Sequence, residues 1–143
     1  MILYLDASAL VKAYVEEVGS PDVRSIIDRA ETVGTAAITR VEVSAGLARA
    51  ARMEILSTSA AEQAVRQFRL EWVSLLRIRI SDPLIRRADD LIWQFGLRGY
   101  DAVHLSAALV WQESLAESVS LATYDQQLWE AGRASELEVW PVA

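Results

Sequence analysis

Short apolar runs that alternate with longer segments of helical pattern constrain this chain more than any other feature. Residues 2–5, 33–38 and 119–122 are such runs. Runs of this length suit strands that are buried on both faces of a sheet, and they are short for buried helices. Strands that alternate with helices imply a parallel sheet with helices on both faces. The sequence therefore predicts an α/β fold with a mostly parallel central sheet.

Capping signals locate several of the expected helices. Ser20-Pro21 and Asp82-Pro83 each join an N-cap residue to a proline at the first helical position, and residues 59–62 form a capping box. Two further strands are expected at residues 75–80 and 138–140. The expected helices span residues 7–15, 20–30, 39–53, 59–72, 82–95, 101–113 and 125–131.

The length and composition favour one domain with its own core. The chain has 143 residues, of which 52% are hydrophobic, and a chain of this size buries about two-thirds of its unfolded surface. The absence of cysteine excludes disulfides, thiolate nucleophiles and Cys-ligated metals. No apolar run approaches the ~18 residues of a membrane span, and no basic signal-peptide region precedes the first strand. We expect a single domain over residues 1–143 that lies in the cytoplasm without a membrane segment.

The net charge of −6 has the wrong sign for a protein that holds nucleic acid by bulk charge. It does not exclude a nuclease that reaches phosphate through bound cations. Residues 40–98 hold ten arginines against seven acids. This segment is either a phosphate-facing surface or a consequence of the arginine preference of the whole chain, in which 13 of 14 basic residues are Arg.

Four acidic residues stand near the ends of the expected strands and the starts of the following helices. Asp6 and Asp125 come just after strands, Glu42 lies in the first turn of the helix after a strand, and Asp101 begins a helix. The carboxyl ends of parallel strands share one edge of the sheet, where ligands bind. Each acid also has a structural alternative, because Asp6 and Asp125 suit N-caps, Asp101 suits a helix N-terminus and Glu42 suits solvent.

The mutual repulsion of such acids suggests a metal site. Carboxylates about 5 Å apart repel each other by roughly 3 kcal/mol at an effective dielectric of about 20. A hard divalent cation such as Mg²⁺ binds oxygen ligands and removes this repulsion. Such an ion also polarises a phosphoryl oxygen and lowers the pKa of an attacking water. The pattern points to metal-assisted phosphodiester hydrolysis.

Other phosphate chemistries fit the sequence less well. Phosphatases that form an aspartyl-phosphate carry a second Asp two residues after the first, and that position is Ser8. A phospho-receiver domain needs a lysine late in the chain, whereas the only lysine is Lys12. No Gly-x-x-x-x-Gly-Lys loop for nucleoside triphosphates is present.

Several other side chains carry two interpretations each. The hydroxyls of Ser8 and Thr123 either support a carboxylate or a metal-bound water, or cap locally. His104 follows Asp101 by one helical turn and is either packed in the core or part of the chemistry. Lys12 either neutralises the acidic site or lies on a helix surface.

Aromatic and amphipathic segments suggest where a partner would bind. Most of the five tryptophans are expected in the core, with one or two left for a dimer or partner surface. The amphipathic helix expected at 59–72 carries Arg66 and Arg69 and is a candidate to hold a partner helix.

Four segments in the same order resemble the PIN-domain family, in particular the VapC-type toxins of type II toxin–antitoxin systems. Together they span nearly the whole chain. The matching residues are LDASAL (5–10) with Lys12 and Glu16, TRVE (39–42) with SAGLAR (44–49), YDAVHLSAA (100–108), and LATYD (121–125) with Leu128.

This resemblance implies a three-layer α/β/α sandwich and Mg²⁺- or Mn²⁺-dependent endoribonuclease activity. It implies that Asp6, Glu42 and Asp101 form an acidic triad and that Asp125 is a fourth, more variable acid. Asp6 and Asp101 would be the principal metal ligands, and Glu42 would hold or activate the attacking water. Asp125 would support a second ion or an ordered water.

The family further implies a homodimer, an RNA substrate and a cognate VapB-type antitoxin that silences the toxin. Two alternatives remain open at this point. One is a housekeeping PIN-type nuclease of RNA processing that has no antitoxin. The other is a catalytically silent PIN-like binding module, which the presence of all four acids argues against.

Overall fold

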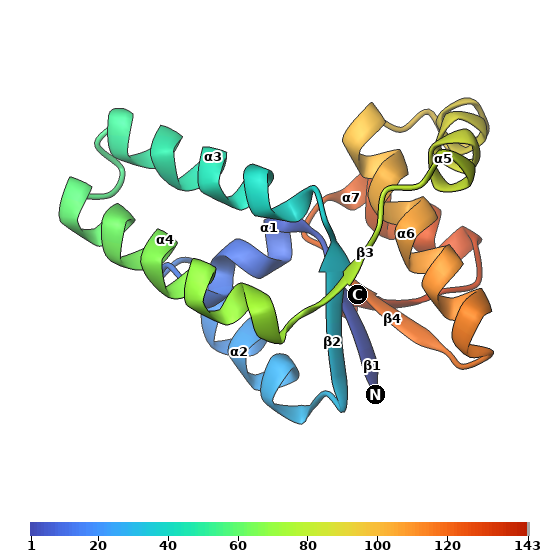
Figure 1. Cartoon of the computed structure of the whole chain (residues 1–143), viewed down its shortest axis with the longest axis horizontal. Helices are drawn as coiled ribbons and strands as arrows, with labels where there is room; N and C mark the ends of the chain where they lie inside the picture. Colours follow the sequence, from blue (N-terminus) through green and yellow to red (C-terminus); the bar gives the residue numbers. More distant parts are fainter. Residues whose placement is uncertain (143) are drawn as a thin grey trace.

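A parallel sheet forms the centre of the computed structural model, which describes residues 1–142 (Figure 1). Within these residues five strands lie in the order β3-β2-β1-β4-β5, and every neighbouring pair is parallel. This arrangement confirms the predicted α/β fold. The strands are β1 (Ile2–Leu5), β2 (Thr32–Ala36), β3 (Leu76–Ile78), β4 (Val119–Ala122) and β5 (Glu138–Trp140).

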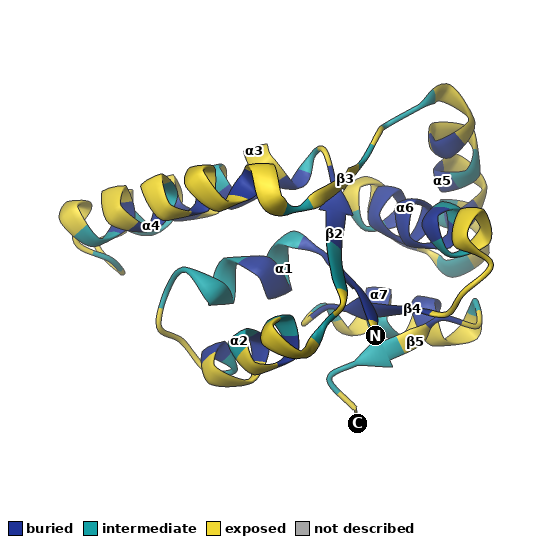
Figure 2. Ribbon diagram, turned by 60° about the horizontal axis from the view of Figure 1, so that its bottom comes forward, coloured by how far each residue is buried: buried dark blue, intermediate teal, exposed yellow. Residues whose placement is uncertain are grey.

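Helices cover both faces of this sheet and complete the predicted three-layer sandwich. Helices α1 to α4 lie on one face, and α5 to α7 lie on the other (Figures 1 and 2). The pair α3–α4 extends well beyond the sheet as a long hairpin (Figure 1). The helices are α1 (Ala7–Leu10), α2 (Ser20–Arg29), α3 (Thr39–Arg52), α4 (Thr58–Glu71), α5 (Asp82–Phe95), α6 (Gly99–Leu115) and α7 (Gln126–Ala134).

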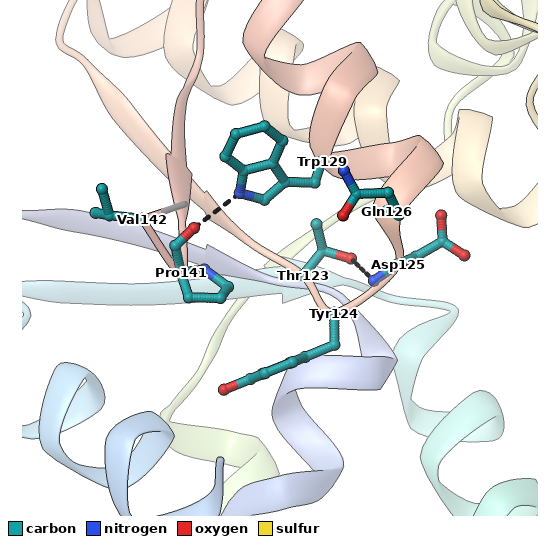
Figure 3. Close-up of a pocket in the computed structure, with 7 residues that line it drawn as sticks. All are labelled: Thr123, Tyr124, Asp125, Gln126, Trp129, Pro141 and Val142. Carbon is teal, nitrogen blue, oxygen red and sulfur yellow. Dashed lines mark hydrogen bonds between the residues drawn. The ribbon is translucent and has the colours of Figure 1, made fainter. Parts of the chain in front are cut away.

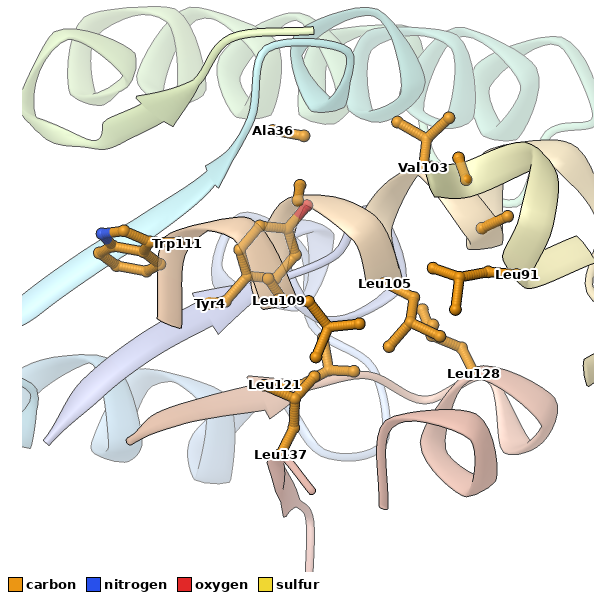
Figure 4. Packing of buried hydrophobic residues seen from close by; sticks show 14 of the residues in the cluster. Tyr4, Ala36, Leu91, Val103, Leu105, Leu109, Trp111, Leu121, Leu128 and Leu137 are labelled. Atoms are coloured by element: carbon orange, nitrogen blue, oxygen red, sulfur yellow. The ribbon is translucent and has the colours of Figure 1, made fainter. Parts of the chain in front are cut away.

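The alternation of β1 divides the core into two clusters. Successive side chains of a strand point to opposite faces. Ile2 and Tyr4 therefore pack in the cluster beneath α5 to α7, which Figure 4 shows, whereas Leu3 and Leu5 pack beneath α1 to α4. All four are buried, as the apolar run predicts for a central strand.

Several helices and strands begin or end at other residues than predicted. The helix expected at 7–15 is α-helical only to Leu10 and continues as a 3₁₀ turn to Ala13. The segment that follows is held by Ser20, whose hydroxyl donates to the Val15 carbonyl and accepts from the Glu17 amide. The strand expected at 75–80 pairs only over residues 76–78, because its neighbour β2 ends there. The helix expected at 101–113 spans residues 99–115.

The helix caps lie slightly before the predicted ones. The Ser57 side chain, not Ser59, caps α4 by accepting from the Ala60 amide. Ser81 caps α5 one residue before Asp82, and Gly19 takes the cap position of α2 one residue before Ser20. In each case the residue in extended or left-handed backbone precedes the predicted cap.

The expectation that most tryptophans are buried is wrong. Trp72 and Trp111 are in the core, Trp129 and Trp140 are half-buried, and Trp93 on α5 is 86% exposed. Among residues 1–142, no helix combines the length and the apolar character needed to cross a bilayer.

Gly34 of β2 leaves space that the Trp111 ring fills. A Cβ atom at Gly34 would lie 2.7 and 2.8 Å from two carbons of that ring. Gly34→Ala is therefore expected to lower the free energy of unfolding by roughly 1–3 kcal/mol through overpacking. Gly46→Ala is the control, because a Cβ there meets nothing within 4 Å and its helix should gain roughly 0.5–1 kcal/mol. Urea denaturation of both variants tests this, and equal shifts would contradict it.

Candidate active site

The candidate site lies where the sheet order reverses direction. From β1 the chain builds outward through β2 and β3, then returns to add β4 and β5 on the other side of β1. Adjacent connections leave in opposite directions at such a point and open a crevice beyond the carboxyl ends of the strands. Asp6 follows β1 directly, and Asp125 lies three residues beyond the end of β4. The predicted edge is therefore the edge at which these two acids lie.

Asp6 is a buried carboxylate that only neutral groups contact through hydrogen bonds. It is 3% exposed. Its Oδ1 accepts from the Ser8 hydroxyl at 2.7 Å and from the Ala9 amide at 3.0 Å, and its Oδ2 accepts from the Thr123 hydroxyl at 2.6 Å. Burial raises the pKa of Asp6, and these donors and the nearby His104 imidazole oppose that rise. The acid is therefore an N-cap of α1 and a buried charge at the same time.

Ser8 and Thr123 connect the loops that follow β1 and β4. The Thr123 hydroxyl donates to Asp6 and accepts from the Asp125 amide at 3.0 Å. The Ser8 hydroxyl likewise donates to Asp6 and accepts from the Tyr124 amide at 3.0 Å. The two hydroxyls thus fix the Asp6 carboxylate relative to the start of α7. Local capping also occurs, because the Asp125 side chain accepts from the Leu128 amide at the start of that helix.

Arg98 joins two of the predicted acids. Its Nε donates to Asp101 Oδ2 at 3.2 Å, and its terminal nitrogen donates to Asp125 Oδ2 at 2.8 Å. The Arg98 side chain is 73% exposed, whereas those of Asp101 and Asp125 are 14% and 21% exposed. The pKa of Asp101 is raised by burial and by the charge of Asp125, and Arg98 opposes this rise. The two carboxylates therefore repel each other across a shared cation.

Glu42 is held by the only histidine of the chain. Its Oε1 lies 2.6 Å from Nε2 of His104, which is buried in α6. The other ring nitrogen, Nδ1, lies 2.7 Å from the Tyr4 hydroxyl of β1. The Glu42 side chain remains 22% exposed. His104 is packed in the core, which is one of the two interpretations considered from the sequence. It also contacts Glu42, a predicted site residue.

Three of the four acids are linked through bridging side chains rather than gathered around one point, whereas Glu42 contacts His104. Asp6 is linked to Asp125 through Thr123, and Asp125 to Asp101 through Arg98. Across residues 1–142, no three Asp, Glu or His side chains are arranged as a ready ligand set. The donors nevertheless fit a hard divalent cation, because all are carboxylates. Asp6 in addition carries a buried charge for which its hydrogen bonds supply no cation.

Two hollows flank the acids. A groove of about 640 Å³ is lined by Glu42 and Asp101 together with apolar side chains of α5, among them Ile85 and Ile92. A smaller hollow of about 190 Å³ lies beside Asp125 and Thr123 and is also lined by Trp129 of α7, Pro141 and Val142 (Figure 3). The acids therefore border open space on both sides.

Sequence reasoning missed the roles of two side chains and left a third open. Arg98 entered only as one of ten arginines, although its position three residues before Asp101 is the spacing of a helical pair. Tyr4 entered only as an aromatic residue of a buried strand. Lys12 donates to Glu17 and to the Val18 carbonyl, and it lies over the Tyr124 ring. Its hydrogen bonds are thus with the loop before α2, whereas its contact with Tyr124 is with the loop between β4 and α7.

Comparisons with known proteins agree with this geometry. The model of the PIN domain family matches residues 3–134. The chain is 30% identical to Ribonuclease VapC45 of Mycobacterium tuberculosis over 140 residues, which cover 98% of this chain and 95% of that protein.

Solved structures share the fold at lower identity. A toxin-antitoxin complex from Klebsiella pneumoniae contains a chain with a TM-score of 0.63 and 17% identity over 87% of both chains. VapBC2 from Rickettsia felis, bound to a DNA fragment from its promoter, gives a TM-score of 0.65 and 17% identity over 97% of both chains. The family match, the parallel sheet order and the acids at its carboxyl edge agree, and the chain belongs to the PIN domain family.

Proposed function

We propose that this protein is a metal-dependent endoribonuclease and the toxin of a type II toxin–antitoxin pair. One observation carries the proposal: Asp6, Asp101 and Asp125 are linked at the switch point of the sheet through Thr123 and Arg98. The names of its relatives, which include a ribonuclease and a toxin-antitoxin complex, support the choice of RNA and of a protein partner. Action in the cytoplasm is part of the same proposal.

The four acids would hold Mg²⁺ or Mn²⁺. Asp6 and Asp101 would be the principal ligands, Asp125 would support a second ion or an ordered water, and Glu42 would hold the attacking water. When bound, the ion would polarise a phosphoryl oxygen and lower the pKa of that water. Thr123 and Ser8 fix the Asp6 carboxylate by donating one hydrogen bond to each of its oxygens. Because the carboxylate is already fixed, it loses less conformational entropy when it binds an ion.

The partners follow from the same site. We propose a cognate VapB-type antitoxin, and the groove of about 640 Å³ beside Asp101 offers apolar and acidic contacts to it. A homodimer is part of the proposal, and the exposed Trp93 on α5 is the kind of residue that such an interface buries. A small open reading frame beside the gene for this protein is the candidate antitoxin gene, and expression of the protein with and without it tests this partner. If the protein cleaves RNA but the neighbouring gene does not relieve growth arrest, the housekeeping nuclease is favoured.

Asp101→Asn and Asp6→Asn are expected to lower Mg²⁺-dependent RNA cleavage by roughly two orders of magnitude or more, because a ligand charge is lost. Asp28→Asn on the exposed face of α2 is the matched control and should cleave like the wild type. Single-turnover cleavage of a labelled RNA, with and without chelator, measures the effect. Equal activity of Asp6→Asn and Asp28→Asn would rule out the metal site.

The buried charge of Asp6 predicts how stability changes with pH in the absence of metal. Because its folded pKa is raised above 3.8, this group contributes stability at low pH that is lost as the pH rises through the raised pKa. In chelator, Asp6→Asn should match the wild type near about pH 4 and become the more stable protein toward neutral pH. The difference in unfolding free energy between Asp28→Asn and the wild type should not grow with pH in this way. Urea midpoints measure both, and an advantage of the wild type that grows with pH would show that Asp6 acts mainly as a cap.

Arg98 is expected to compete with the divalent ion for Asp101 and Asp125. Arg98→Gln should therefore raise the apparent Mn²⁺ affinity by roughly two- to five-fold, the scale of an exposed ion pair. Arg87→Gln is the matched control, because Arg87 pairs with Glu113 between α5 and α6 at 2.7 Å. Isothermal titration and the Mn²⁺-dependent rise in Tm report the affinity. Weaker Mn²⁺ binding by Arg98→Gln would mean that the arginine supports the ion.

A further inference from the structure

His104 is the one imidazole of the chain, and it is buried in a region of α6 that faces the sheet. It is 1% exposed and hydrogen-bonded at both ring nitrogens. The residues at the two ends lie far away in sequence, since Tyr4 is 100 positions and Glu42 is 62 positions from it. The three side chains come from β1, α6 and α3 and form one chain of hydrogen bonds from the core to the acidic site.

The contact with Glu42 fixes where one proton of the imidazole lies. An ionised carboxylate only accepts, so Nε2 of His104 must carry the proton that points to Glu42. At the other end of the ring, the Nδ1 atom shares a hydrogen bond of 2.7 Å with the Tyr4 hydroxyl. Tyr4 is fully buried, and its ring meets the imidazole edge-on with centroids 5.9 Å apart. The orientation of the imidazole is therefore set by a strand of the central sheet.

This orientation determines what Glu42 presents to the groove. The His104 contact is to Oε1 of Glu42, at 2.6 Å. The side chain lines the groove of about 640 Å³ together with Asp101. A glutamate in the first turn of a helix otherwise has three rotatable bonds, and ordering them costs entropy. A carboxylate with one oxygen fixed in this way offers its other oxygen in a defined direction.

We propose that His104 is a positioning residue that, backed by Tyr4, orients the Glu42 carboxylate toward the acidic site. The inference rests on the proposed function, and it assigns to the histidine no proton transfer with substrate. Groups that orient ligand side chains contribute about 10- to 100-fold to metal affinity or activity. His104 should therefore influence the chemistry without touching RNA or the ion.

Ser106 provides a matched control for the effect that the loss of a buried polar contact in α6 has on stability. It lies two residues further on α6, is fully buried, and its hydroxyl donates to the Leu84 carbonyl at 2.8 Å. Ser106→Ala removes a buried hydrogen bond from the same helix, but one directed toward α5 rather than toward Glu42. Any effect of His104 that Ser106→Ala reproduces is thus due to stability alone.

The single histidine makes a direct spectroscopic test possible. Long-range ¹H–¹⁵N correlation spectra of the metal-free protein should show one imidazole, protonated at Nε2. Glu42→Gln should shift the Nε2 resonance, and Tyr4→Phe should shift the Nδ1 resonance. Ser106→Ala should leave both nearly unchanged. An imidazole protonated only at Nδ1, or one insensitive to Glu42→Gln, would overturn the proposal.

Variants of His104 separate positioning from folding. His104→Leu should lower Mn²⁺ affinity and kcat for RNA cleavage by roughly 10- to 100-fold, with little change in KM. His104→Gln should recover part of both losses, because its amide can donate to Glu42. Ser106→Ala should lower Tm but keep Mn²⁺ affinity and kcat at temperatures where it is folded.

The outcomes distinguish this inference from the proposed function. If the wild type neither binds Mn²⁺ nor cleaves RNA, the proposed function fails, whatever the spectra show. If the wild type does both, and His104→Leu changes only Tm, as Ser106→Ala does, then His104 is a packing residue and the inference fails.

Discussion

The structure depends on the burial of one carboxylate at the end of the central strand. Asp6 stands where β1 stops between its two neighbours, and it is 3% exposed. A charge at this depth requires hydrogen bonds, and three neutral donors supply them. One of these donors, Thr123, belongs to the loop after β4. The hydrogen bond from Thr123 to Asp6 therefore connects the loop after β1 with the loop after β4, at the switch point of the sheet.

The other three acids are contacted by two further groups. Arg98 lies between Asp101 and Asp125, and His104 contacts Glu42. The compensation is uneven, because Arg98 is largely exposed whereas His104 is buried. An exposed arginine is held weakly and exchanges with solvent ions. A buried, doubly hydrogen-bonded histidine is not displaced in this way. The site thus combines Arg98, an arginine that other cations can displace, with a Glu42 carboxylate whose orientation is fixed.

Much of this edge could be predicted from the sequence, because the signals are local. The apolar run before Asp6 marks a buried strand, and the order of strands and helices sets the edge at which the acids lie. The contacts of Arg98 and His104 could not be predicted in the same way. Arg98 bonds Asp125, 27 positions away, and His104 bonds Tyr4, 100 positions away. Such pairings depend on how helices pack across the sheet, which periodicity does not specify.

Structural and chemical roles coincide in this site, although sequence reasoning set them against each other. Asp6 and Asp125 are N-caps and also hold carboxylates at the edge of the sheet. Capping fixes one oxygen of each acid by a backbone amide, Oδ1 in both cases. The second oxygen then points in a direction set by the helix start rather than by a flexible side chain. A cap at the end of a parallel strand is therefore also a means of aiming a ligand. The same reasoning applies to His104, whose burial is what makes its contact with Glu42 rigid.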